Sequence, residues 1–137
     1  MSSIGKLEKS LITFNSDLMK EYIKKGKRKE HISQTSIGGM YNSNVHRDGS
    51  GQPPNPIANQ LESALLRMGP INTRSPICHN IIGCCCEVRV SNHLILKQPI
   101  PHKVKVKDII FTKARRVRTN QYMKRCKNCI SVFGREK

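Results

Sequence analysis

The sequence is short of the residues that fill a hydrophobic core. It contains no tryptophan, aromatic residues make up 4% of its 137 positions, and hydrophobic residues make up 36%. A chain of this length forms one domain, or one small domain with a loose arm. So few apolar side chains predict a compact piece that buries only part of the chain.

Acidic residues are scarce as well. The sequence has 9 aspartates and glutamates against 25 lysines and arginines, which gives a formal net charge of +16. An excess of this size repels itself within a compact fold and attracts polyanions. We therefore expect a nucleic acid as the partner, with an anionic membrane or an acidic protein as the alternatives.

Long apolar runs are also missing. No run reaches the roughly 18 apolar residues of a membrane span, so we predict no transmembrane helix. The N-terminus lacks the apolar core of a signal peptide, because Lys6, Glu8 and Lys9 interrupt it. We expect a protein that is not secreted and stays in a reducing compartment. Its 6 cysteines are then thiols or metal ligands rather than a disulfide framework.

Familiar catalytic motifs are absent from the sequence. It has no phosphate-binding Gly-rich loop ending in Lys-Ser/Thr, no Gly-x-Ser-x-Gly and no His-Glu-x-x-His. The acidic residues are scattered, which argues against a two-metal carboxylate site. Cys78 and His79 are a possible nucleophile and base, but neighbours in sequence rarely face each other productively. We therefore expect a protein that is not an enzyme.

The residues that are present begin with an amphipathic segment. Residues 5–25 carry apolar residues at helical spacing and predict a helix within an N-terminal segment, 1–26, whose stripe is a packing face. A partner helix or a membrane surface is the alternative for that stripe. Residues 27–56 are dense in Gly, Ser, Asn and Pro and predict a flexible linker. The stripe consists of Leu7, Leu11, Phe14, Leu18 and Tyr22.

Residues 57–137 predict a cysteine-containing basic domain that binds nucleic acid. It opens with a short helix over 56–69. Alternating residues then predict three strands, two within 83–98 and one within 102–111. The predicted fold class is α+β: a small antiparallel β-meander with flanking helices, one possible zinc site and a flexible N-terminal arm.

The positive charge gathers at two places in the sequence. One cluster, "KKGKRK", occupies residues 24–29, and the other covers 101–137, where only Asp108 and Glu136 oppose it. The third predicted strand would present its lysines on one face. Residues 112–125 predict a helix with arginines near its N-terminus, where backbone N–H groups favour phosphate.

The cysteines offer half of a metal site at the C-terminus. Cys126 and Cys129 have the two-residue gap that lets both thiolates bind one tetrahedral zinc ion. No cysteine or histidine follows Cys129, so further ligands come from upstream. On a strand, Cys84 and Cys86 share one face and Cys85 takes the other, which favours the former pair. The alternatives are Cys78 or His79 together with one of Cys84, Cys85 and Cys86, and as a fallback His93, beside free thiols without metal and redox or intermolecular disulfide chemistry.

The end of the chain resembles a known family. The segments "KARRVR", "TNQYMK" and "RCKNC" over residues 113–129 are similar to the small cysteine-rich nucleic-acid-binding proteins of filamentous plant viruses, the carlaviruses and their trichovirus, vitivirus and allexivirus relatives. The resemblance implies binding of single- and double-stranded nucleic acid with little sequence choice, suppression of RNA silencing, and a place in the host cytoplasm or nucleus. It also implies Cys126 and Cys129 as the first ligands of a zinc finger, beside a binding run of Arg115, Arg116 and Arg118.

We therefore expect a viral-type protein that binds RNA or single-stranded DNA by neutralising phosphates, ordered by one Zn²⁺, with host proteins as further partners. One alternative is a structural component of a ribonucleoprotein. The other is an interaction protein whose N-terminal helix engages a membrane or a host partner. The expected nucleic-acid contacts, with Tyr122 stacking on a base, are Lys103, Lys105, Lys107, Lys113, Arg115, Arg116, Arg118, Tyr122, Lys124, Arg125 and Lys127.

Overall fold

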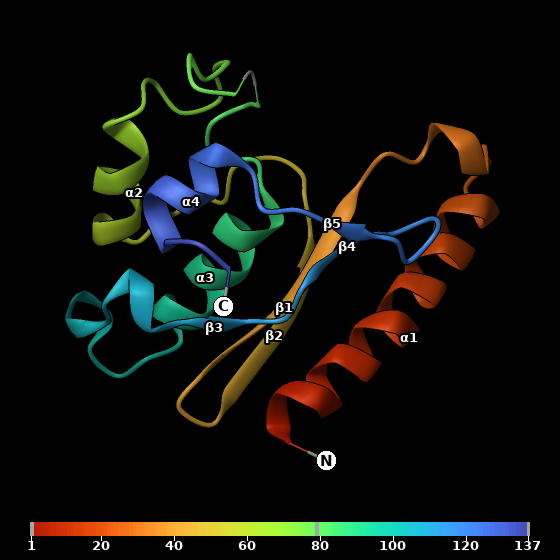
Figure 1. Cartoon of the computed structure of the whole chain (residues 1–137), viewed down its shortest axis with the longest axis horizontal. Coiled ribbons are helices and arrows are strands. Elements are labelled where there is room, and N and C mark those ends of the chain that lie inside the picture. Colours follow the sequence, from red (N-terminus) through yellow and green to blue (C-terminus); the bar gives the residue numbers. More distant parts are fainter. Residues whose placement is uncertain (1, 79, 137) are drawn as a thin grey trace.

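A computed structural model describes residues 2–78 and 80–136, which form four helices and a five-stranded antiparallel sheet (Figure 1). The α+β fold class predicted from the sequence is thus confirmed. None of the described helices has the length and apolar content needed to cross a bilayer. In chain order the elements are α1 (Ser3–Lys24), η1 (Lys29–His31), β1 (Thr35–Tyr41), β2 (Asn44–Gly49), α2 (Asn59–Leu66), α3 (Cys86–Leu96), η2 (Pro101–Lys103), η3 (Val106–Asp108), β3 (Ile110–Phe111), β4 (Ala114–Arg116), β5 (Tyr122–Met123) and α4 (Lys127–Phe133), where η marks a single 3₁₀ turn.

The sheet is built around β1. Its strand order is β2-β1-β4-β5, and the short β3 pairs with the other half of β1 on the same side as β4. Thr112 bridges the break between β3 and β4, because its N–H donates to the Gly38 carbonyl at 2.8 Å and its hydroxyl accepts from the Gly38 N–H at 2.9 Å. Strand β1 therefore has a neighbour along both edges.

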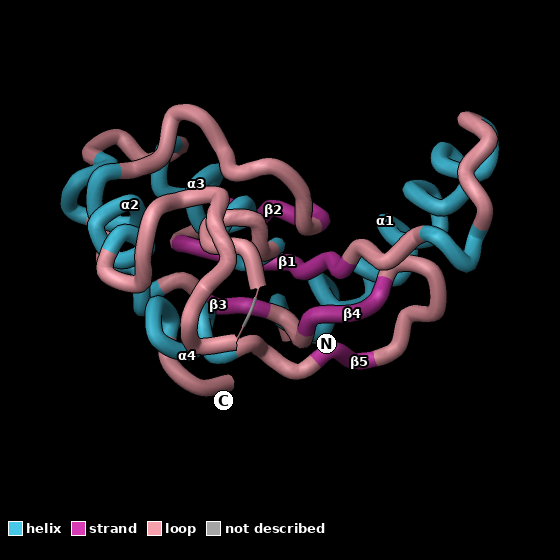
Figure 2. Tube along the Cα trace, turned by 90° about the horizontal axis from the view of Figure 1, so that it is seen from above, coloured by secondary structure: helices cyan, strands magenta, loops and turns pink. Residues whose placement is uncertain are grey.

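Helices cover both faces of β1, with α1 on one side and α2, α3 and α4 on the other (Figures 1 and 2). Two glycines allow this close approach. A Cβ at Gly38 would lie 2.9 Å from Leu7 Cγ on α1, and a Cβ at Gly39 would lie 2.6 Å from Val90 Cγ1 on α3. The flexible linker predicted over 27–56 is therefore wrong for β1 and β2. The glycines of this segment permit close packing of helices against the strand, whereas a glycine-rich sequence by itself indicates flexibility.

The helix predicted over 5–25 is confirmed as α1, and the one over 56–69 as α2. The first half of α1 buries Leu7 and Leu11 against the sheet. This helix is therefore part of the folded domain, and the predicted flexible N-terminal arm is wrong. Asn15 is fully buried and joins three elements. Its Oδ1 accepts from the Ser36 hydroxyl of β1, and its Nδ2 donates to Asn120 Oδ1 in the turn between β4 and β5 at 2.8 Å.

The two strands predicted within 83–98 are wrong, because the structure has α3 there. Cys86, Val90 and Leu94 are four residues apart, a spacing that places side chains on one face both of a strand and of a helix. The apolar pattern therefore fits either element. The helix is buried nearly all round, which removes the polar face that marks a surface helix. Its buried residues are Cys86, Glu87, Val88, Val90, Ser91, Asn92, Leu94 and Ile95.

Two further predictions are wrong in the basic region. Lys103, Lys105 and Lys107 lie exposed on or beside the 3₁₀ turns η2 and η3, and the strand keeps only β3 of its predicted length. The helix predicted over 112–125 is the hairpin of β4 and β5. Asn120 adopts a positive φ of 61° in its turn, a conformation that asparagine tolerates better than most residues.

We predict that Gly39→Ala destabilises the protein by about 1–3 kcal/mol, since the new methyl group must displace the Val90 side chain in a packed core. The measurement is the midpoint of urea unfolding. The matched control is Gly51→Ala, whose Cβ would meet nothing closer than 3.7 Å. Equal effects of the two substitutions would contradict the close contact between β1 and α3.

Candidate metal centre

Three thiols meet where two helices begin. Cys85 immediately precedes α3, Cys126 immediately precedes α4, and Cys129 lies in the first turn of α4. Their sulfur atoms all lie within 4.8 Å of one another, and Cys85 Sγ is 3.8 Å from Cys126 Sγ. Cys85 and Cys126 are half-buried and Cys129 is buried. The group joins segments about forty residues apart in the sequence.

These distances fit one metal ion. Zinc–sulfur bonds of about 2.3 Å at tetrahedral angles place two sulfurs about 3.8 Å apart, the separation found for Cys85 and Cys126. A disulfide bond would need about 2.05 Å, and all three cysteines are free. Cys85, Cys126 and Cys129 can therefore hold a metal ion through three thiolates.

The thiols already favour one ionised sulfur. Hydrogen bonds from the Cys129 and Cys85 thiols, and from the Cys129 N–H, lower the pKa of Cys126 well below its usual value. The same contacts with Cys126 raise the pKa of Cys85 and of Cys129. The three sulfurs thus interact with one another, and a metal ion bound by them would displace their protons.

The structure selects different upstream ligands from those predicted. Cys126 and Cys129 belong to the cluster, but Cys85 completes it in place of Cys84 and Cys86. Strand alternation would place Cys84 and Cys86 on one face, but these residues lie at the start of a helix, where their side chains point away from the cluster. Cys84 Sγ lies 3.7 Å from Asn72 Oδ1, and Cys86 Sγ lies 3.6 Å from Thr35 Oγ1. Within the described residues Cys78 is not part of the group, and His79 lies outside them.

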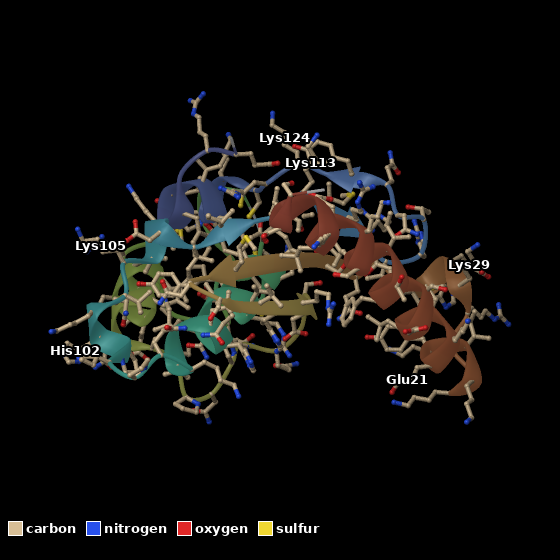
Figure 3. The ribbon with its side chains drawn as sticks, turned by 90° about the horizontal axis from the view of Figure 1, so that it is seen from below. Glu21, Lys29, His102, Lys105, Lys113 and Lys124 are labelled. Carbon is tan, nitrogen blue, oxygen red and sulfur yellow. The ribbon has the colours of Figure 1, made fainter. Side chains whose placement is uncertain are left out.

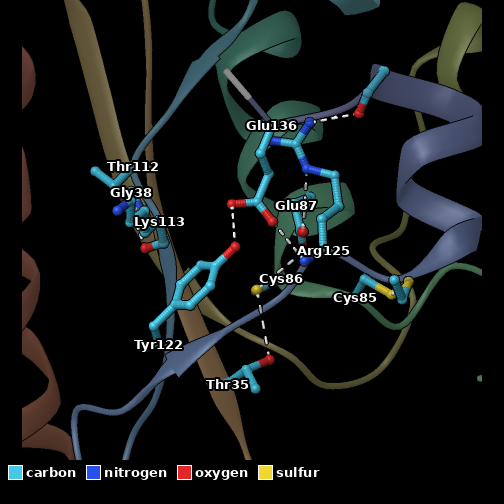
Figure 4. A network of polar contacts seen from close by, with 12 residues as sticks. Thr35, Gly38, Cys85, Cys86, Glu87, Thr112, Lys113, Tyr122, Arg125 and Glu136 are labelled. Atoms are coloured by element: carbon cyan, nitrogen blue, oxygen red, sulfur yellow. Dashed lines mark hydrogen bonds and ion pairs between the residues drawn. The ribbon is translucent and has the colours of Figure 1, made fainter.

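A buried carboxylate stands beside the thiols. Glu87, in the first turn of α3, is 5% exposed. Its Oε1 accepts from the Cys86 thiol at 3.2 Å, and its Oε2 lies 3.9 Å from Arg125 Nε (Figure 4). Burial raises the pKa of Glu87. Its oxygens are not within the thiol group, so Glu87 is a neighbour of the candidate metal rather than one of its ligands.

Glu87 and two of the three cluster cysteines, Cys85 and Cys126, line a shared cavity of about 520 Å³. Its walls come from the start of β1, the end of β2, the loop before α3, and the hairpin of β4 and β5. Hydroxyl and amide side chains supply much of the lining. The lining residues are Ser33, Thr35, Ser50, Asn80, Ile81, Cys84, Cys85, Cys86, Glu87, Ala114, Met123, Lys124 and Cys126. A cavity of this volume suits a small organic ligand.

Arg125 is packed in the interior beside Glu87. Its Nη1 donates to the Gly134 carbonyl at 2.7 Å, its guanidinium stacks over Phe111, and its side chain is only 9% exposed. This arginine was expected to contact phosphate. The structure places it in the interior instead, where it faces Glu87.

The other predicted nucleic-acid contacts are dispersed. Arg115 pairs with Glu8 of α1 at 3.7 Å, and the Tyr122 hydroxyl donates to Glu136 at 2.9 Å. Lys113 lies over the Tyr122 ring. Lys124 and Lys127 are exposed, and Arg116 and Arg118 are half-buried. Lys103 is on η2, Lys107 is on η3 and Lys105 lies between these two turns, so the structure does not gather the predicted contacts into one face.

Comparison with known proteins gives no relative: no family model, no curated protein and no solved structure matches this chain. The fold and the site define the molecule only as an α+β protein with a three-thiol centre beside a buried carboxylate. The resemblance of residues 113–129 to the plant-virus proteins therefore stays a prediction.

Sequence reasoning left Cys85 among the alternatives and missed Glu87, although the sequence holds a signal for both. Cys85-x-Glu87 followed by Cys126-x-x-Cys129 matches the ligands and the catalytic glutamate of the zinc-deaminase signature, whereas Arg125 stands where that signature has proline. Each half is weak alone. The proximity of the two halves in the structure makes the pattern informative.

We predict that Arg125→Ala lowers the free energy of unfolding by about 3–5 kcal/mol, because it leaves the buried Glu87 without its charged neighbour. The control is Arg135→Ala, an exposed arginine ten residues further on, which should change stability by no more than about 0.5 kcal/mol. Urea unfolding measures both. Similar values for the two variants would show that Arg125 is not part of a buried pair.

Proposed function

We propose that this protein is a zinc-dependent hydrolase that removes the exocyclic amino group of a nucleobase. The observation that carries the proposal is that Cys85 and Cys126 of the three-thiol group line one cavity together with the buried Glu87. Nucleobase deaminases with a Cys₃ centre combine these ligands with a glutamate that does not bind the metal. The proposal replaces the non-catalytic protein expected from the sequence.

Zinc is the metal that this donor set favours. Thiolates are soft ligands that select zinc over magnesium or calcium, and four-coordinate geometry suits the sulfur separation. A structural zinc site is closed by four protein ligands, whereas a catalytic site keeps one position for water or substrate. The three-thiol group in the described residues, with Cys85 and Cys126 on the cavity wall, supports the open kind.

The chemistry follows from these positions. Zinc held by three protein ligands lowers the pKa of a water molecule and so supplies a nucleophile at neutral pH. Glu87 accepts a proton as the water oxygen attacks the ring carbon that carries the amino group. The same carboxyl group then delivers a proton to the amino nitrogen, which leaves as ammonia. The carbon–nitrogen bond is replaced by a carbon–oxygen bond without any change of oxidation state.

Burial prepares Glu87 for this role. A carboxyl group shielded from water exchanges protons more readily near neutral pH than an exposed one. The Cys86 thiol donates to Oε1 and the Arg125 guanidinium lies 3.9 Å from Oε2, and these contacts orient the carboxyl group on α3. The hydroxyl and amide groups of Ser33, Thr35 and Asn80 offer hydrogen-bonding partners for the edge of a base.

The second candidate function is the one expected from the sequence: nucleic-acid binding in which the metal only orders the fold. The net charge of +16 favours it. The two candidates differ in what Glu87 does: in a deaminase its carboxyl group acts on the substrate, whereas in a structural centre it serves only as the buried partner of Arg125. Suppression of RNA silencing would require either activity to act on a host RNA.

We predict that the purified protein contains one zinc ion per chain. Cys85→Ser, Cys126→Ser and Cys129→Ser should each weaken zinc binding by at least tenfold, since each removes one thiolate from the ion. Cys84→Ser is the matched control, because its sulfur faces Asn72 and should leave zinc binding unchanged. Competition with a chelator measures the affinities. Zinc that depends on Cys84 and not on Cys85 would refute the site.

We predict that the protein releases ammonia from cytosine- or adenine-containing substrates, and that Glu87→Gln lowers kcat by about 10²–10⁴-fold, the usual contribution of a general acid–base group. The variant should keep its zinc, because Glu87 does not contact the ion. The assay covers nucleosides and single-stranded oligonucleotides of DNA and RNA. If no substrate loses ammonia while zinc is fully bound, the centre is structural.

A further inference from the structure

We propose that the substrate is a base within a single-stranded nucleic acid, whose phosphates run along a basic rim that leads to the cavity. The inference rests on the proposed deaminase function and names its substrate class. We define the basic rim by its cations: Lys27, Arg28, Lys29, Arg116, Arg118 and Lys124.

The first observation is that two basic clusters far apart in the sequence meet. The Arg118 guanidinium donates to the Glu30 carbonyl at 2.9 Å, and the Arg116 guanidinium donates to the Ser33 carbonyl at 3.0 Å. These bonds join β4 and the turn after it to the segment that follows α1. Lys27, Arg28 and Lys29, all exposed, therefore lie near the hairpin arginines (Figure 1).

The second observation is that the joined clusters reach the cavity. Ser33, which accepts the bond from Arg116, is part of the cavity wall, and so are Thr35 and Lys124. The exposed Lys124 comes one residue after β5, two positions before Cys126. Lys124 thus borders the opening beside Cys126 and Glu87, Arg116 is bonded to the cavity wall at Ser33, and the exposed cations of 27–29 lie four to six residues before Ser33. In Figure 3 the Lys124 side chain points outward beside Lys113, and Lys29 lies at the end of the molecule formed by the C-terminal part of α1.

The third observation is the charge balance of the basic rim. Within 27–33 the sequence has one acidic residue, Glu30, against three cations, and the hairpin residues 114–124 have none. Several cations outside the rim have acidic partners, as Arg115 has Glu8, Lys25 has Glu21 and Arg89 has Asp48, whereas no ion pair of the described residues includes a rim cation. An array of cations with little opposing charge attracts a polyphosphate more strongly than a single nucleoside.

A single strand fits this arrangement better than a duplex. Glu87 lies in the interior with 5% of its surface exposed, so the reacting base must enter the cavity. A base in a duplex reaches such a site only by flipping out, at a cost of a few kcal/mol, which a single strand avoids. The contacts to phosphate would position the strand without choosing its sequence.

The test compares two sets of charge-matched variants in the full chain, both made on Glu87→Gln so that bound oligonucleotide is not converted. The first changes Lys27, Arg28 and Lys29 to Gln. The second changes Lys103, Lys105 and Lys107 to Gln, which removes the same charge from exposed positions around η2 and η3. Figure 3 places Lys105 at the opposite end of the molecule from Lys29. Binding of a fluorescent 20-nucleotide single strand is measured against salt.

We expect the first set to raise the Kd at least tenfold at low salt. It should also reduce the slope of log K against log salt by about 2, because each lost phosphate contact removes about 0.7. The second set should stay within about twofold of the parent. Equal weakening by both sets would show that only total charge matters and would overturn the rim, and so would no weakening by the first.

Turnover separates this inference from the proposed function. With the wild-type side chain at Glu87, we expect kcat/KM for the oligonucleotide to exceed that for the free nucleoside by at least a hundredfold. A protein that deaminates nucleosides and refuses oligonucleotides would refute the inference and leave the deaminase standing. A protein that deaminates neither, yet binds the strand through the rim, would refute the deaminase and support the rim as a nucleic-acid surface.

Discussion

The structure depends on the meeting of the starts of α3 and α4 at three sulfur atoms. These two helices lie on the same face of the sheet, and the cluster of Cys85, Cys126 and Cys129 joins their first turns. A chain with a net charge of +16 and few aromatic residues gains little from burial and loses some stability to its own repulsion. A metal ion bound there would supply folding free energy directly, so the same atoms would serve stability and chemistry.

The central strand prepares the other side of the site. Gly38 and Gly39 let helices approach both faces of β1, and this brings α3 close enough for Cys86 to reach Thr35. Glu87 then has a fixed place between the Cys86 thiol and Arg125. Arg125 in turn is held by the end of α4 through the Gly134 carbonyl. The position of the Glu87 carboxylate is therefore set by the packing of β1, α3 and α4 against one another rather than by α3 alone.

Much of this could be predicted from the sequence, and the failures have physical causes. The stripe of α1 and the short α2 followed from helical spacing, and Cys126 and Cys129 followed from their two-residue gap. The segment 83–98 misled, because steps of two and four coincide in a helix buried on all sides, and this error exchanged Cys85 for Cys84 and Cys86. The glycines of β1 indicated a linker, because the helices that pack against them come from distant parts of the sequence. The basic cluster at 24–29 is brought near the hairpin arginines by hydrogen bonds to Ser33 and Glu30, just after the cluster. These bonds join residues 83 and 88 positions apart in the sequence, and local patterns cannot reveal them.

The central claim is that the metal is zinc bound by three thiolates with one position left for water or substrate. X-ray absorption at the zinc edge of the purified protein tests this most directly, since it counts the ligands by element and distance. The account predicts three sulfur atoms at about 2.3 Å and one oxygen or nitrogen atom at about 2.0 Å. Four sulfur atoms, or a shell without sulfur, would contradict it.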